Sequence, residues 1–425
     1  MKKRLKTILS VLAAILSAAV FCACGKPEPV APPPDLSKPD LPEEENLETE
    51  WAKKKFHLEP LVKPFWLDTV MTDETVLMVQ YGDSEDAYGT LAYEPIKILK
   101  VQNYGEDLIL EEGKDYTVEG RRISRVSDSI FPFLKFSELI GTGFPTGAHY
   151  PAKPDSPGGA DQVFYTEGEL LPWHSVKVTY EYNPADIGFA APAYKGGKLP
   201  RTVERLKAGK LRAMFYGDSV ATGCSSSGYM NIMPYMHDWM DLFPMGLESY
   251  YGCETRSFNT SVGGKDSNWG LINVQENVID YAPELVVLRF GANDGGFNIP
   301  ENGWEVPASD FKMRIKGIIE DTRDALGDDV EFILLAPMLS NPYSTLANKQ
   351  GDYPAVLEEL EKEIAGVVHC DIQAIQAELW NYKLYADLLV NNINHPNDYL
   401  IRIHAMSLLA TLIDYKAEQG EAAES

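Results

Sequence analysis

The pattern of apolar and polar positions changes near the middle of the chain. Residues 174–182 alternate between the two kinds, and residues 75–81 form a short apolar run rich in β-branched side chains. A period of two is typical of a strand with one buried face. Long helical periodicity is missing between residues 51 and 183, so this stretch is predicted to form an antiparallel, β-sandwich-like domain.

After residue 211, short apolar runs alternate with segments of helical length. The strand candidates are residues 212–216, 255–259, 285–290, 331–336 and 367–371, and the helix candidates are residues 229–250, 267–281, 309–326, 353–365 and 398–417. This order predicts an α/β domain over residues 211–417, with a parallel sheet covered by helices on both faces. Residues 184–210 are predicted to be a linker, and residues 418–425 a tail.

The first residues have the pattern of an export signal. Four Lys or Arg among the first six residues precede an apolar run, residues 7–21, that ends in Phe21-Cys22-Ala23-Cys24. This run is shorter than the ~20 residues of a membrane-spanning helix. Its end resembles a bacterial lipobox, which predicts a lipoprotein signal peptide over residues 1–23 and a lipid on Cys24. The alternative is plain secretion with cleavage near Ala23.

A lipid on Cys24 would place the protein outside the cell, held at the bacterial surface by that lipid alone. Residues 24–50 are rich in Pro, Asp and Glu, which stiffen and extend a chain, so they are predicted to be a tether.

Composition excludes some partners. The 425 residues include 38 Lys and Arg against 63 Asp and Glu, a formal charge of −25. This balance argues against a nucleic-acid partner, because phosphate recognition needs clustered cations. The histidines show no zinc-ligand spacing, so no metal site is predicted. The pairing of Cys224, Cys253 and Cys370 and the oligomeric state are left open.

Chemically useful residues follow three strand candidates and precede the last helix. The four blocks are Gly217-Asp218-Ser219, Gly263-Gly264, Gly291-Ala292-Asn293-Asp294 and His395-Pro396. The carboxyl ends of parallel strands meet at one edge of a sheet, where ligands bind. A hydroxyl, an imidazole, a glycine amide and a side-chain amide at that edge are sufficient for acyl transfer.

These four blocks, in this order, resemble those of the SGNH (GDSL) hydrolase family of esterases and lipases. The resemblance covers about residues 211–417 and implies a flavodoxin-like, three-layer sheet. It implies Ser219 as the nucleophile and His395 as the base. Gly264 and Asn293, with the Ser219 amide, would stabilise the oxyanion. The reaction would need no metal or organic cofactor.

One position departs from the family pattern. The family usually has an Asp three residues before the catalytic histidine, and this chain has Asn392 there. In a serine protease the Asp→Asn change lowers kcat by about 10⁴. Three explanations remain open. The Asn392 carbonyl oxygen or a backbone carbonyl orients His395 in a dyad, Asp398 or Asp387 supplies the acid, or the site is degenerate.

The substrate is expected to be a small ester or an acetylated glycan, because the β-rich part followed by this family's domain resembles two-domain carbohydrate acetyl esterases. Trp269, Trp304 and Asp294 are candidates for the substrate pocket. Trp51, Trp66 and Trp173 are expected to pack in the β-rich core rather than to stack on sugars. The alternatives are a polysaccharide O-acetyltransferase and a non-catalytic glycan-binding lipoprotein.

Overall fold

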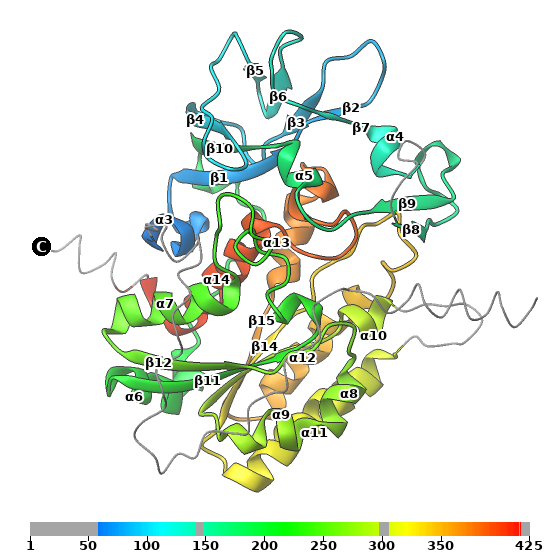
Figure 1. Cartoon of the computed structure of the whole chain (residues 1–425). Helices are drawn as coiled ribbons and strands as arrows, with labels where there is room; N and C mark the ends of the chain where they lie inside the picture. Colours follow the sequence, from blue (N-terminus) through cyan, green and yellow to red (C-terminus); the bar gives the residue numbers. More distant parts are fainter. Residues whose placement is uncertain (1–57, 142–147, 297–305, 416, 418–425) are drawn as a thin grey trace, which may run out of the picture.

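A computed structural model describes residues 58–141, 148–296, 306–415 and 417. The predicted parallel sheet is present, with its strands in the order β12-β11-β13-β14-β15 (Figure 1). The strands are β11 (Lys210–Gly217), β12 (Glu254–Asn259), β13 (Leu285–Arg289), β14 (Glu331–Leu335) and β15 (Val367–Cys370). All four pairings are parallel. This order is that of a flavodoxin-like sheet.

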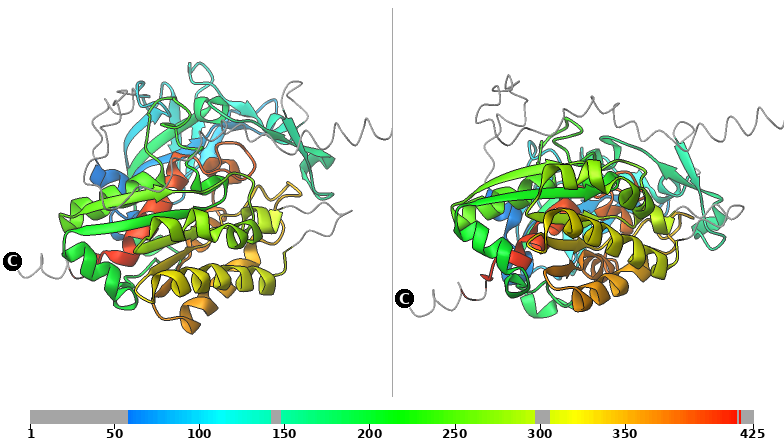
Figure 2. Two further views of the ribbon diagram at one scale, coloured as in Figure 1. Left: turned by 60° about the horizontal axis from the view of Figure 1, so that its bottom comes forward. Right: turned by 90° about the horizontal axis from the view of Figure 1, so that it is seen from below.

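Helices cover this sheet in two groups, which makes the three layers seen in Figures 1 and 2. The long helices are α7 (Trp239–Tyr251), α11 (Ala308–Leu326), α12 (Tyr353–Glu363), α13 (Ile372–Leu379) and α14 (Asp398–Leu412). α7 packs on α14, and α11 packs on α12 and on α8 (Ser267–Ile272). β13, β14 and β15 are buried along their whole length, and most of their residues are apolar, as burial on both faces of a sheet requires.

Three predicted helices differ from those observed, and one of them, expected over residues 398–417, ends at Leu412. The helix expected from residue 229 begins at Trp239, because the Asp238 side chain accepts a hydrogen bond from the Trp239 amide and caps the helix there. The helix expected over residues 267–281 is broken into α8, α9 (Val274–Asn277) and a 3₁₀ turn (Ile279–Tyr281). Asn273 lies at the first break, and its side chain donates to the Trp269 carbonyl.

The region before β11 holds the predicted strands, divided among three sheets rather than set in a simple antiparallel sandwich. The first sheet contains β1 (Val70–Leu77), β10 (Ser175–Glu181) and β4 (Lys97–Asn103). The second contains β5 (Tyr116–Glu119), β6 (Arg122–Arg125), β3 (Tyr88–Thr90), β2 (Val79–Gln80) and β7 (Leu134–Lys135), of which β2 and β7 pair in parallel. A separate hairpin contains β8 (Ala148–Pro151) and β9 (Gln162–Tyr165).

Short helices accompany these sheets: α3 (Leu58–Val62), α4 (Phe136–Leu139) and α5 (Leu170–Trp173). Trp66 is buried between Phe65 and Phe189, as expected. Trp173 is 66% exposed, contrary to the expectation that it packs in the core. Trp51 lies outside the described residues.

The segment expected to be a linker contains helix α6 (Pro200–Lys207) and is part of the α/β body. The backbone amides of Arg201 and Thr202 donate to the Glu331 carboxylate, at 3.1 and 2.7 Å. Free amides at a helix start and a carboxylate attract each other, so this contact fixes α6 against β14.

Buried charges join the β-rich region to the α/β body. The Lys383 ammonium contacts Glu74 of β1 and lies 3.5 Å from Asp387, and all three side chains are fully buried. Asp387 also accepts from the Leu77 amide at 2.6 Å. Burying these charges is strongly destabilising unless they are paired. The pairing forms only when the β-rich region and the α/β body are docked in this arrangement, so the cluster favours it.

Residues 1–57, which include the predicted signal peptide, the tether and Cys24, lie outside the described residues. Among the helices that the structure describes, none has the length and hydropathy of a membrane span. Cys224, Cys253 and Cys370, the three cysteines among the described residues, form no disulfide with one another.

Candidate active site

The carboxyl end of β11 positions the predicted nucleophile. The strand ends at Gly217, and Ser219 begins a 3₁₀ turn (Ser219–Ala221). Ser219 is almost fully buried, and its Oγ lies 3.0 Å from Nε2 of His395. This is the hydrogen-bond distance that a nucleophile and its general base require.

A buried ion pair holds this turn. The Asp218 carboxylate accepts from the Arg289 guanidinium at 2.5 Å, from the Val220 amide at 3.1 Å and from the Ala292 amide at 3.3 Å. Asp218 and Arg289 have no exposed surface. Burial lowers the pKa of Arg289, and the Asp218 charge opposes that shift. Because Arg289 ends β13, the pair ties the nucleophile turn to the start of the Asn293 loop. The sequence carried no signal for Arg289.

The histidine loop is shaped by a neighbouring side chain. Oδ1 of Asn391 accepts from the backbone amides of Ile393, Asn394 and His395, at 2.9, 2.9 and 3.0 Å. An Asn that satisfies successive amides in this way stabilises a tight turn. The turn directs the His395 ring toward Ser219.

Asn392 does not orient His395. It is fully buried, and its amide group donates to the carbonyl oxygens of Leu139 at 2.9 Å and Phe164 at 2.8 Å. Its φ is +66°, a left-handed conformation that Asn tolerates better than most residues. An Asp at this position would place a negatively charged carboxylate next to two carbonyl oxygens that need a donor. This explains why position 392 has Asn and not Asp.

The two other acids considered for this role are engaged elsewhere. Asp387 belongs to the buried cluster with Lys383, and burial raises the pKa of Asp387 to about 6. Asp398 lies in the first turn of α14 and accepts from the Ser227 amide and hydroxyl, at 2.9 and 2.7 Å. Burial raises the pKa of Asp398, with Lys177 opposing the shift.

A different carboxylate lies beside the histidine. Oε1 of Glu167, two residues beyond β9, is 3.3 Å from Nδ1 of His395, an ion-pair contact that is not aligned as a hydrogen bond. Burial by itself would raise the pKa of Glu167. Its contacts with His395, Tyr165 and Asn391 lower that pKa by more than burial raises it, so the pKa of Glu167 is below its usual value. No motif or spacing in the sequence pointed to Glu167.

The remaining predicted catalytic residues share one pocket of about 300 Å³ with Ser219 and His395. Gly264 and Asn293 line it, and the Asn293 amide donates to the Lys265 carbonyl at 2.8 Å, which leaves a second N–H for an oxyanion. Gly264 has a φ of +75°, which favours glycine. The hairpin also lines this pocket, through Tyr150 and Tyr165, whose rings meet edge to face at 5.4 Å.

Two of the predicted substrate-pocket residues lie elsewhere, and the third is outside the described residues. Trp269 packs against Tyr216, with ring centroids 5.9 Å apart, and does not line the pocket. Asp294 is buried and accepts from the Ser267 amide at 3.1 Å, so it fixes the start of α8. Burial raises the pKa of Asp294 to about 6. Trp304 is not among the described residues.

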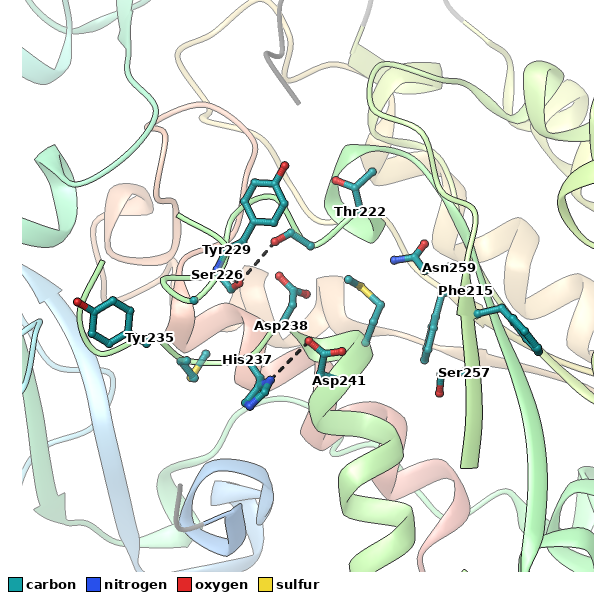
Figure 3. A pocket seen from close by; sticks show the side chains of 15 residues that line it. Phe215, Thr222, Ser226, Tyr229, Tyr235, His237, Asp238, Asp241, Ser257 and Asn259 are labelled. Carbon is teal, nitrogen blue, oxygen red and sulfur yellow. Dashed lines mark hydrogen bonds and ion pairs between the residues drawn. The ribbon is translucent and has the colours of Figure 1, made fainter. Parts of the chain in front are cut away.

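A second cavity, of about 310 Å³, lies beside β11 and β12 and shares no lining residue with the first (Figure 3). In it His237 pairs with Asp241 at 3.7 Å, and the Tyr229 amide donates to Ser226 at 3.1 Å. This cavity therefore has a histidine–acid pair but lacks the serine–histidine contact of the first. Among the described residues, no group of three His, Cys, Asp or Glu has a metal-binding arrangement.

The first pocket thus combines a hydroxyl, an imidazole within hydrogen-bond distance of it and N–H groups, an arrangement that can perform acyl transfer. Residues 215–400 match the model of the GDSL-like Lipase/Acylhydrolase family. No curated protein matches the chain.

The solved structures similar to the chain include two esterases. One is Axe2, an acetylxylan esterase from Geobacillus stearothermophilus, which is 19% identical over 48% of this chain and 94% of its own, with a TM-score of 0.40. The other is a two-domain esterase, CEX, active on acetylated mannans, which is 18% identical over 53% of this chain and 54% of its own, with a TM-score of 0.41.

Proposed function

Since residues 215–400 belong to the GDSL-like lipase/acylhydrolase family of carboxylic ester hydrolases, we propose that the protein is a serine esterase that removes acetyl groups from carbohydrate. The observation that carries this proposal is the 3.0 Å contact between Ser219 Oγ and His395 Nε2, at the end of a parallel strand and in one pocket with Gly264 and Asn293.

The reaction proceeds in two steps. His395 Nε2 takes the Ser219 proton while Oγ bonds to the ester carbonyl carbon, and the carbonyl oxygen becomes an oxyanion facing Gly264, Asn293 and the Ser219 amide. The bond to the alcohol then breaks, and Nε2 returns the proton to the alcohol oxygen. A water molecule repeats the sequence on the acyl-enzyme and releases the carboxylic acid.

The pocket favours a short acyl group on a polar substrate. Of its described lining residues only Ala292 and Leu346 have aliphatic side chains. Long acyl chains need an extended apolar wall, because each buried methylene contributes about 0.8 kcal/mol. The tyrosines and asparagines of the pocket instead offer ring faces and hydrogen bonds, which suit a sugar.

The test is ester release by the full chain, measured on p-nitrophenyl acetate, butyrate and octanoate and on acetylated xylan and mannan oligosaccharides. We expect acetate release that falls with acyl length and is abolished by Ser219→Ala. Product formation that depends on an acceptor alcohol would favour the acetyltransferase. Glycan binding without turnover, unchanged by Ser219→Ala, would favour a binding protein.

We also propose that the esterase acts at the bacterial surface, anchored through a lipid on Cys24. The support is the basic and apolar leader with its lipobox-like end. Mass spectrometry of the mature N-terminus tests this point. A diacylglyceryl group on Cys24, absent from Cys24→Ser, is expected, and an unmodified N-terminus near Ala23 would contradict it.

A further inference from the structure

We propose that Glu167, supplied by the β8–β9 hairpin, takes the place of the missing acid as the residue that positions His395. The proposal rests on the serine esterase mechanism above. Its observation is the 3.3 Å contact between Glu167 Oε1 and His395 Nδ1, on the side of the ring opposite Ser219.

The position of Glu167 is built by the surrounding chain. Tyr165 donates its hydroxyl proton to Oε1 at 2.5 Å, and the Asn391 side chain donates to the same oxygen at 3.4 Å. The backbone before it is fixed to the histidine loop as well. The Asn392 side chain donates to the Phe164 carbonyl, and the Thr166 amide donates to the Asn391 carbonyl at 3.4 Å.

The hairpin itself is fastened to the α/β body. The Lys153 amide donates to the Tyr343 carbonyl at 2.8 Å, and the Thr345 amide donates to the Pro151 carbonyl at 3.0 Å. The carboxylate is therefore held from both ends of the hairpin. An Asp three residues before the histidine would be placed beside it by the local chain geometry. In this chain the carboxylate of Glu167 is placed beside His395 by the docking of the hairpin on the α/β body.

The role follows from the charge that the reaction creates. When His395 accepts the serine proton, its ring becomes positive while Nδ1 lies 3.3 Å from Oε1 of the Glu167 carboxylate. An anion there stabilises the imidazolium and selects the tautomer whose Nε2 is free to accept. Because the Glu167 side chain is 39% exposed, solvent screens the interaction. Its removal should therefore cost less than the ~10⁴-fold seen when a buried acid is changed.

The first test compares Glu167→Gln with Glu169→Gln in the full chain. Glu169 follows the same hairpin and is the N-cap residue of α5, where its side chain makes no capping hydrogen bond. We expect Glu167→Gln to lower kcat about 10- to 100-fold with KM unchanged. Glu169→Gln should match the wild type, and both variants should have the wild-type urea midpoint. Wild-type kcat in Glu167→Gln would overturn the proposal.

Chemical rescue distinguishes a positioning role from a structural one. The site is open to solvent, so formate should restore part of the activity of Glu167→Ala in a concentration-dependent way and leave Glu169→Ala unchanged. The kcat of Glu167→Asp should lie between that of Glu167→Gln and that of the wild type. A loss that formate does not rescue, accompanied by a lowered urea midpoint, would show that Glu167 is only structural.

A fluorophosphonate probe keeps this proposal separate from the proposed function, because it reports an activated serine without requiring the natural substrate. If the wild type is not labelled at Ser219, the esterase proposal fails. If the wild type is labelled and Glu167→Gln reacts equally fast, only the Glu167 proposal fails. The expected result is labelling of Glu167→Gln about 10- to 100-fold slower than wild type.

Discussion

The side chain of Asn392 donates a 2.8 Å hydrogen bond to the carbonyl oxygen of Phe164, across the junction between the histidine loop and β9. A second bond reaches the Leu139 carbonyl at 2.9 Å. Position 392, where the family that the sequence resembles usually has an acid, thus serves here to dock the β-rich region. Docking in turn brings Glu167 to His395.

Replacing Asn392 by the Asp that is usual in the family should therefore destabilise the protein and not raise its kcat. Asn392→Asp sets a buried carboxylate against two carbonyl oxygens and loses two donors, and should destabilise the protein by about 3 kcal/mol or more. Asn392→Ala should cost about 2 kcal/mol by leaving the two carbonyls unpaired. Urea unfolding measures both. A raised kcat in Asn392→Asp at unchanged stability would contradict this account.

The Asp218–Arg289 pair should be essential for stability rather than for substrate binding. Asp218→Ala leaves a fully buried guanidinium without its partner and should cost about 3–5 kcal/mol. The double variant Asp218→Ala/Arg289→Met should recover part of that loss, because the unpaired charge is gone. Thermal and urea unfolding of the wild type, the two single variants Asp218→Ala and Arg289→Met, and the double variant test the coupling. A double variant whose loss equals the sum of the two single losses would show that the two charges are independent.

Removing the Asn293 amide should affect the transition state and not the ground state. Asn293→Ala deletes the N–H that we propose as an oxyanion donor and should lower kcat about 10²–10³-fold, with little change in KM. His237→Ala serves as the control, since that histidine lines the separate cavity of Figure 3. A rise in KM at unchanged kcat would assign Asn293 to substrate binding instead.

Asp294 should make stability depend on pH with the opposite sign to an ordinary surface carboxylate. Its pKa is raised from 3.8 to about 6 in the folded protein, mainly by burial. The folded state therefore holds more protons than the unfolded state between these values, and the contribution of Asp294 to stability falls as pH rises through that window.

Asn in place of Asp294 cannot titrate, so the difference between the two proteins isolates this group. Between pH 4 and pH 7, we expect the free energy of unfolding of Asp294→Asn to rise by up to about 3 kcal/mol relative to that of the wild type. Urea unfolding at both pH values measures this difference. A difference that stays constant over this range would mean that Asp294 titrates normally.

The local pattern was sufficient for what depends on neighbouring residues. Apolar runs alternating with helical segments predicted all five strands of the parallel sheet to within two residues at each end. Because the carboxyl ends of those strands meet at one edge, the same pattern predicted that Ser219, Gly264, Asn293 and His395 would converge, and all four line one pocket.

Tertiary structure alone decided what depends on contacts between distant segments. Glu167 lies in a turn with no motif, and only the docking of the hairpin on the histidine loop brings it to Nδ1 of His395. Trp269 follows Gly264 closely in sequence, yet its ring packs against Tyr216 and does not line the pocket. Periodicity reports which face of an element is buried, whereas the partner of a buried or reactive group is set by how elements pack in space.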